Sequence, residues 1–187
     1  RTISVITVSA QGTTALESDT AVATINKDTT GPTVSVPSNI TVDAESAAGT
    51  SASNTAIVAF LQAATATDAT DGSVSVTNNA PTEFEIGSTT VTFSAVDSLG
   101  NLGSDTATVT IEDQTAPMVT APGAATVAAT DTNGTLATDA TIVAFLAGAS
   151  ATDNVDLDLT ITNNAPTTFP LGATEVIFSA TDSSNLI

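Results

Sequence analysis

The chain lacks several residue types on which much protein chemistry depends. Its 187 residues include no cysteine, histidine, tryptophan or tyrosine. The absence of cysteine excludes disulfides, thiol nucleophiles and thiolate metal sites. The absence of histidine removes most general-base and zinc chemistry. The longest purely apolar run, residues 56–61, is far shorter than the ~20 residues that span a bilayer, so no membrane insertion is expected.

Basic residues are almost absent as well. Two Lys and Arg residues stand against 20 Asp and Glu, which gives a net charge of −18. Such a chain repels phosphate backbones and anionic lipid surfaces, so neither nucleic acid nor a membrane surface is an expected partner. Paired carboxylates can do acid/base work, but two cationic residues offer no clamp for a transition state. We therefore predict that the chain is not an enzyme, and its acidity indicates either a well-solvated surface or a site for cations.

The sequence repeats with a shift of 85 residues, from Asp28 to Asp113. Residues 28–97 align with residues 113–182 without a gap, which predicts a tandem array. Residues 6–10 and 18–25 resemble residues 91–95 and 104–111, so residues 1–27 are interpreted as the C-terminal hairpin of a preceding module. Residues 28–112 form a complete module, called here the first module, and residues 113–187 form a second module that lacks its last strand. The segments around Asp28 and Asp113 are the first and second junctions.

Short apolar or alternating segments between turn residues predict β-strands. In the first module they lie at residues 33–36, 40–43, 55–61, 74–78, 83–86, 89–96 and 105–112. The inward-facing residues of the last two strands are expected to be Val91, Phe93, Ala95, Ala107, Val109 and Ile111. A helix over residues 56–66 is the alternative, disfavoured by the poor helix formers Ile57, Val58 and Thr65. Seven short strands predict an all-β fold: tandem immunoglobulin-like Greek-key β-sandwiches in a linear array, with both terminal modules incomplete.

Acidic residues gather in three segments that this topology brings to one pole of each module. They are the linker and the two loops at residues 66–72 and 97–101, together with their counterparts one repeat later. The candidate ligands are Asp28, Asp68, Asp71, Asp97 and Asn101 at the first junction, and Asp113, Asp153, Asp156, Asp158, Asp182 and Asn185 at the second. Crowded carboxylates repel one another unless a cation lies among them. An all-oxygen set suits a hard cation, and we predict calcium.

Each of these Asp residues also has a plainer interpretation, because Asp in loops often bonds its own backbone as a turn former. The loop that follows Asp182 is counted as one residue shorter than the loop after Asp97, which leaves its ligand geometry open. Asp43, Glu45, Asp131 and Asp139 are assigned to strand ends and loops toward the opposite pole, where they keep the surface solvated.

The run from Phe84 to Asn101, with the linker Asp and Pro and the segment Val36–Val42, resembles the hyalin repeat. The resemblance covers residues 28–112 in full and residues 113–187 except the final strand. Members often carry a cysteine before the first-strand Pro, where Val36 and Ala121 stand here, so a disulfide is excluded. The resemblance implies an extracellular, immunoglobulin-like module associated with adhesion and structure.

Two classes of function stay open. The first is a structural segment of a secreted or cell-surface fibre or stalk, stiffened by calcium at its junctions. Its partners are neighbouring copies of the same repeat, either in one long chain or as subunits joined by strand complementation. The second is a glycan- or receptor-binding module, although carbohydrate faces usually need aromatic platforms and the chain has neither Trp nor Tyr.

Overall fold

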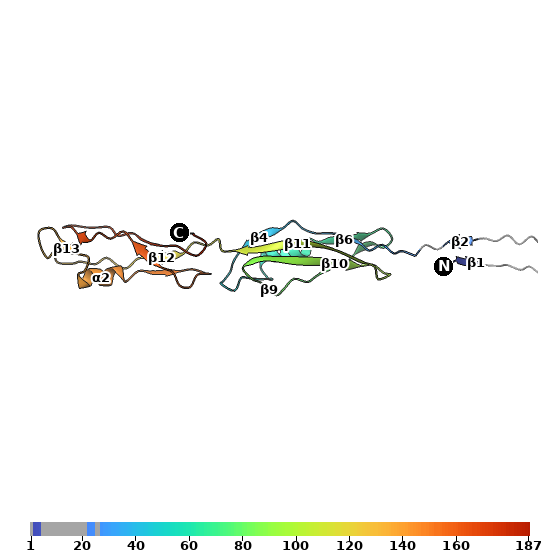
Figure 1. Cartoon of the computed structure of the whole chain (residues 1–187), viewed down its shortest axis with the longest axis horizontal. Coiled ribbons are helices and arrows are strands. Elements are labelled where there is room, and N and C mark those ends of the chain that lie inside the picture. Colours follow the sequence, from blue (N-terminus) through green and yellow to red (C-terminus); the bar gives the residue numbers. More distant parts are fainter. Residues whose placement is uncertain (1, 5–21, 25–26) are drawn as a thin grey trace, which may run out of the picture.

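A computed structural model describes residues 2–4, 22–24 and 27–187 of the chain, and these residues form an elongated array of strands with two short helices (Figure 1). The predicted all-β class is confirmed. At the N-terminal end, β1 (Thr2–Ser4) pairs antiparallel with β2 (Val22–Thr24). Most of the hairpin predicted for residues 1–27 lies outside the described residues. Among the described residues, no helix is long and apolar enough to cross a membrane.

The first module consists of a four-stranded sheet, a three-stranded sheet and a short strand pair. The first sheet has the order β4 (Ile40–Asp43), β11 (Leu102–Glu112), β10 (Gly87–Val96), β8 (Val76–Asn78), and the second the order β3 (Thr33–Ser35), β6 (Thr65–Asp68), β7 (Gly72–Val74). The pair is β5 (Thr50–Ser51) with β9 (Glu83–Phe84). Only β4 and β11 are parallel. The chain therefore changes between these two sheets three times: between β3 and β4, between β4 and β6, and between β7 and β8.

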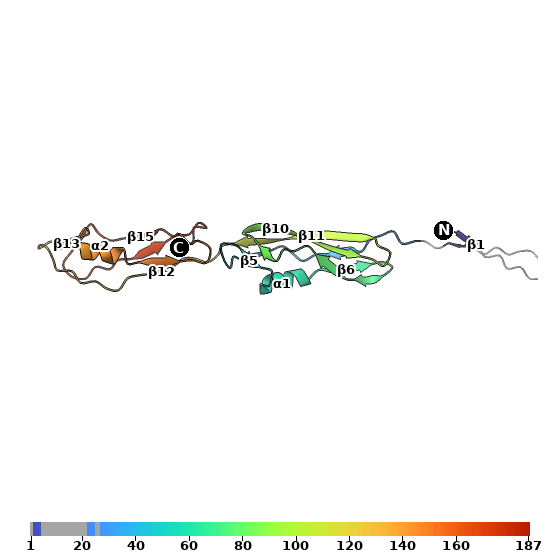
Figure 2. The ribbon, with the colours of Figure 1, turned by 90° about the horizontal axis from the view of Figure 1, so that it is seen from below.

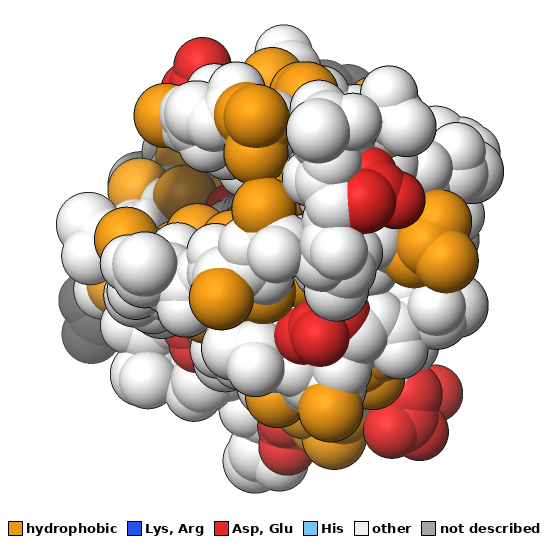
Figure 3. All heavy atoms as spheres, turned by 90° about the vertical axis from the view of Figure 1, so that its left-hand side faces the viewer, with side chains coloured by type: hydrophobic (Ala, Val, Ile, Leu, Met, Phe, Trp, Pro, Cys, Tyr) orange, Lys and Arg blue, Asp and Glu red, His pale blue; other side chains and the backbone are white. Residues whose placement is uncertain are grey.

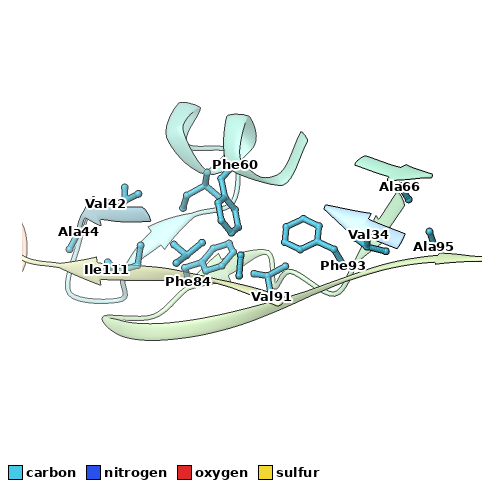
Figure 4. Close-up of a cluster of buried hydrophobic side chains, with 13 residues drawn as sticks. Val34, Val42, Ala44, Phe60, Ala66, Phe84, Val91, Phe93, Ala95 and Ile111 are labelled. Carbon is cyan, nitrogen blue, oxygen red and sulfur yellow. The ribbon is translucent and has the colours of Figure 1, made fainter. Parts of the chain in front are cut away.

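The core lies between these sheets, and it contains the inward-facing residues that alternation along β10 and β11 predicts (Figure 4). Val91, Phe93 and Ala95 are buried on β10, as are Ala107, Val109 and Ile111 on β11. Phe84 packs among them from β9. Phe60 contributes an edge-to-face contact with Phe93, at 5.7 Å between ring centroids. Small β-branched residues and a few Phe rings thus build the core of a module that has no larger aromatic residue.

The predicted strand at residues 55–61 is wrong, because this segment is the helix α1 (Thr55–Gln62). The Asn54 side chain caps the helix by accepting the N–H of Ala56, an interaction typical of helix starts. Ile57 and Phe60, three residues apart, then point one apolar face at the core. Figure 2 shows α1 along one side of the module. Capping and helical spacing outweigh the low helix propensity of the β-branched residues.

The predicted loop at residues 66–72 is also corrected. Thr65–Asp68 form β6 and Gly72–Val74 form β7, so only residues 69–71 make the turn between them. Asp68 is therefore the last residue of a strand that pairs with β3, and its position is fixed by the sheet.

The second module follows this order with shorter elements and with no strand at the positions of β4 and β7: β12 (Met118–Thr120), β13 (Thr135–Leu136), α2 (Ala140–Leu146), β14 (Ser150–Thr152), β15 (Ile161–Asn163), β16 (Thr168–Phe169) and β17 (Phe178–Ala180). It contains a groove of about 340 Å³ that Val127, Phe145, Phe169 and Gly172 help to line. In the first module, the counterparts of Val127 and Gly172 are Val42 and Gly87, which pair with β11 on its two sides. Phe145 and Phe169 are accordingly only partly buried, whereas Phe60 and Phe84 are buried.

Candidate metal centres at the two junctions

Three carboxylates meet at the first junction. Asp28 comes from the linker, Asp68 from the end of β6 and Asp97 from the residue after β10, and each offers an oxygen within 4.8 Å of the other two. Asp68 and Asp97 are only 8% and 7% exposed. The linker and the ends of two strands thus deliver three anionic groups to one partly buried place.

Local turn chemistry aims two of these carboxylates. The Oδ1 atom of Asp68 accepts the N–H groups of Thr70 and Asp71 at 2.8 and 3.1 Å. The Oδ1 atom of Asp97 accepts the N–H groups of Leu99 and Asn101 at 2.9 and 2.8 Å. Each side chain therefore closes its own turn through its Oδ1 atom. The turn-former interpretation and the ligand interpretation apply to the same residues.

The predicted ligand Asp71 has a different position. It is exposed, and its carboxylate accepts the N–H of Ser98 at 2.6 Å and the Ser98 hydroxyl at 3.0 Å. Asp71 thereby ties the β6–β7 turn to the turn after β10. Its counterpart Asp156 does the same in the second module, accepting the N–H and hydroxyl of Ser183, both at 2.9 Å. Asp156 also belongs to the second cluster, which Asp71 does not in the first.

Hydrogen-bond donors compensate much of the charge at the first junction. The Nδ2 group of Asn101 donates to Oδ2 of Asp97 at 2.6 Å and to the carbonyl oxygen of Asp28 at 3.4 Å. The N–H of Thr30 and the Thr70 hydroxyl, in that order, lower the pKa of Asp28 below its ordinary value. Burial raises the pKa of Asp97, but the side chain and N–H of Asn101 and further N–H groups outweigh it, so that pKa is lowered too. These carboxylates are stable as anions at neutral pH.

The second junction has the same framework. Asp113, Asp156 and Asp182 each offer an oxygen within 4.8 Å of the others. Asp153 closes its turn by accepting the N–H groups of Val155 and Asp156 at 2.8 and 2.9 Å. Burial, followed by the negative charges of Asp153, Asp182 and Asp156, raises the pKa of Asp113 above its ordinary value. The ionised form of the linker carboxylate is thus disfavoured at Asp113 and favoured at Asp28.

Four buried side-chain oxygens within residues 27–187 have no hydrogen-bond partner, and all four lie at this second junction. They are Oδ2 of Asp113, Asp153 and Asp182 and Oδ1 of Asn154. Asp182 is only 7% exposed. A buried acceptor without a partner is costly, and a buried anion more so. A cation coordinated by these oxygens would remove that cost.

Two other predicted ligands do not join the second cluster. Asp158 is exposed and lies outside the group of converging carboxylates. Asn185 is exposed and has a φ of 66°, where Gly100 of the first module has a φ of 85°. The N–H of Leu186 bonds Asp182 as the N–H of Asn101 bonds Asp97. The loop after Asp182 is therefore not one residue shorter, and Leu186, not Asn185, is the counterpart of Asn101.

A contact between the modules was missed in the sequence, where Asp43 was assigned to the solvated surface. Its carboxylate accepts the N–H of Gln114 at 2.8 Å and the hydroxyl of Thr115 at 2.7 Å. Asn154 donates to the carbonyl oxygen of Ala44, and Val155 packs against the core of the first module. The structure explains this contact: β4 pairs parallel with β11, so both strands end at the same pole, and β11 leads into the linker.

The acidic residues are distributed differently at the far end of the second module. There the Asp and Glu side chains lie apart among apolar and neutral ones (Figure 3). Such separated carboxylates are solvated individually. The carboxylates in this view thus differ from those of the two junctions, where three converge.

Comparison with known proteins relates the first cluster to a family. The family model described as HYR domain matches residues 27–111, a span that contains Asp28, Asp68 and Asp97. No curated protein sequence matches the chain.

Proposed function

From the match of residues 27–111 to the HYR domain family model, we propose that the chain is a segment of an extracellular fibre or stalk whose junctions are stiffened by calcium. HYR domains are typically extracellular, adhesion-like modules, and the family is a non-catalytic repeat family. The function is then mechanical: the modules hold a fixed spacing and direction along the array. The immunoglobulin-like sandwich topology of each module is part of the same proposal.

The unpartnered oxygens of Asp113, Asp153 and Asp182 carry the calcium proposal. Calcium takes roughly 6–8 oxygen ligands from carboxylates, amide groups and carbonyls in flexible geometry. The second junction offers four carboxylates and the amide oxygen of Asn154 without a basic side chain nearby to neutralise them. An oxygen-only set of this charge favours a hard cation over zinc or copper.

The linker explains why such an ion would stiffen the array. Asp43 of the first module holds Gln114 and Thr115 by two hydrogen bonds. An ion that binds Asp113 together with Asp156 and Asp182 would hold the adjoining linker residue to the second module. The linker is then fixed from both sides, and the contact of Val155 with the first core is retained. Without the ion, repulsion among the carboxylates opposes the same arrangement.

The test compares the full chain with calcium and with a chelator. We expect a smaller spread of inter-module orientations in small-angle X-ray scattering and a higher melting temperature with calcium. Asp182→Asn keeps the turn acceptor but removes one charge, and it should weaken both responses. Glu85→Gln, an exposed carboxylate away from the junctions, is the control. Identical scattering and melting curves with and without chelator would refute the calcium proposal.

The groove of the second module supports a further part of the proposal, polymerisation by strand complementation. In the first module, β11 pairs Ile111 with Val42 on one side and with Gly87 on the other. The groove is lined by their counterparts Val127 and Gly172. Residues 18–25 carry the sequence pattern of residues 104–111 of β11. We propose that this segment of a second copy enters the groove as an added strand.

Substitutions within residues 18–25 test this in the full chain. Ile25 aligns with the buried Ile111, so Ile25→Asp should abolish concentration-dependent association in sedimentation velocity. Thr24→Asp is the matched control, because Thr24 aligns with the partly exposed Thr110. A parent chain that sediments as a monomer at every concentration contradicts strand exchange between copies.

A further inference from the structure

The two junctions share their carboxylates but differ in the residues around them. The shift of 85 residues places Val155 at the position of Thr70 and Leu186 at the position of Asn101. From this difference we infer that the junctions are unequal cation sites, the second binding calcium tightly and the first weakly. The inference rests on the proposed function and specifies which junction responds to the ion.

The first junction supplies its own donors. Asn101 places its amide group 2.6 Å from Oδ2 of Asp97, so this oxygen is already bonded. The Thr70 hydroxyl also lies close enough to Asp28 to lower its pKa. No oxygen of Asp28, Asp68 or Asp97 is among the buried side-chain oxygens without a partner in residues 27–187. A calcium ion would have to displace these bonds, and their loss offsets part of the gain from coordination.

The second junction lacks both side-chain donors. Val155 has no hydroxyl group, and its apolar side chain packs against the core of the first module instead. Leu186 donates only its backbone N–H, to Oδ1 of Asp182, which leaves Oδ2 buried and without a partner. A cation gains the full interaction with this oxygen and breaks no hydrogen bond to reach it.

Asn154 adds a ligand that the first junction does not have, since Ala69 stands at that position. Its Nδ2 group donates to the carbonyl oxygen of Ala44 in the first module, and its Oδ1 atom is buried without a partner. An ion bound to that oxygen would connect directly to the contact between the modules. Occupancy of the second junction therefore affects the orientation of the modules more than occupancy of the first.

The number of charged ligands and the rigidity of a site set calcium affinity over several orders of magnitude. Compared with the first junction, the second has no counterpart of the Thr70 and Asn101 side-chain donors, and it has a fourth carboxylate and the amide oxygen of Asn154. Each of these differences raises the calcium affinity of the second junction. We expect calcium to bind the second junction at least about tenfold more tightly than the first.

Calorimetric titration of the full chain with calcium chloride tests the inference. We expect two separable binding steps, with the tight step lost in Asp182→Asn and the weak step lost in Asp97→Asn. These variants keep the acceptor that each turn needs. Two equal steps, or a tight step lost in Asp97→Asn, would overturn the inference and leave the proposed function intact. Absence of both steps would overturn the proposed function and the inference together.

A second experiment exchanges the uncharged residues beside the carboxylates between the two junctions. Thr70→Val with Asn101→Leu should tighten calcium binding at the first junction severalfold, because it removes the competing donors. Val155→Thr with Leu186→Asn should weaken binding at the second junction. Thermal unfolding in chelator checks that each pair of substitutions leaves the modules folded. Unchanged affinities in folded variants would show that the donors do not set the difference, and the inference would fail.

Discussion

Removal of the Asp43 carboxylate should release the second module from the first. Asp43 accepts two hydrogen bonds from the linker, at 2.8 Å from the N–H of Gln114 and 2.7 Å from the hydroxyl of Thr115. A hydrogen bond to a charged group contributes about 1.5–3 kcal/mol net, and less where solvent screens the charge. Taking about 1 kcal/mol for each, because Gln114 and Thr115 are exposed and Asp43 is only partly buried, Asp43→Ala should cost the docked arrangement about 2 kcal/mol. That corresponds to an increase of about thirtyfold in the ratio of undocked to docked molecules.

The absence of cysteine makes the assay direct. Thr90→Cys and Thr160→Cys place one spin label on an exposed position of each module, with no native thiol to compete. Distances measured by double electron–electron resonance in chelator should be more broadly distributed in Asp43→Ala than in the parent chain. Chelator is used because an ion at Asp113 would hold the adjoining linker residue independently.

The control for this experiment is Glu85→Ala, which removes one negative charge from an exposed strand residue of the same module. It should leave the distance distribution of the parent chain unchanged. If Asp43→Ala shows the same narrow distribution as the control, the two linker hydrogen bonds do not orient the modules. The reasoning from their geometry would then be refuted.

Three further predictions concern stability. Phe84→Ala should destabilise the first module by about 3–5 kcal/mol in denaturant unfolding, because Phe84 is 0% exposed. Phe169→Ala should destabilise the second module clearly less, because Phe169 borders the groove. Equal losses of stability would contradict this account of the groove. Asn54→Ala removes the cap of α1 and should cost about 1 kcal/mol by the same measurement, with Asn54→Asp restoring most of it. In chelator the contribution of Asp113 to the melting temperature should fall as pH rises from below the ordinary Asp value of 3.8, since its raised pKa makes its ionisation costlier in the folded state, whereas the lowered pKa values of Asp28 and Asp97 act in the opposite direction. Asp113→Asn should remove that component, and an unchanged pH profile in this variant would contradict the assignment.

The sequence was informative where a residue's role depends on periodicity along the chain. Alternation along residues 89–96 and 105–112 identified the buried residues of β10 and β11. It misassigned α1, because a helix of eight residues with a β-branched centre presents the same apolar run as a buried strand. The cap at Asn54, repeated as Asp139 before α2, was the signal that distinguishes them. A polar residue that begins an apolar run at the same place in both repeats favours a helix start over a strand.

The sequence predicted which carboxylates lie at the candidate site, but not which of their oxygens are buried without a hydrogen-bond partner. Counting Asp residues across the repeat gives the same framework at both junctions, and the structure brings three carboxylates together at each. What distinguishes the junctions is whether a neighbouring side chain donates to them, which depends on Asn101 and Thr70 in one module and on Leu186 and Val155 in the other. Leu186 could be matched to Asn101 only after the backbone placed Asn185 in the turn conformation of Gly100. Both junctions therefore carry Asp at the same repeat positions, but the uncharged residues beside these carboxylates give the two sites different chemistry. Net charge alone does not separate a solvated acidic surface from an ion site, whereas the unbonded, buried Oδ2 atoms of the second junction support the proposed ion site there.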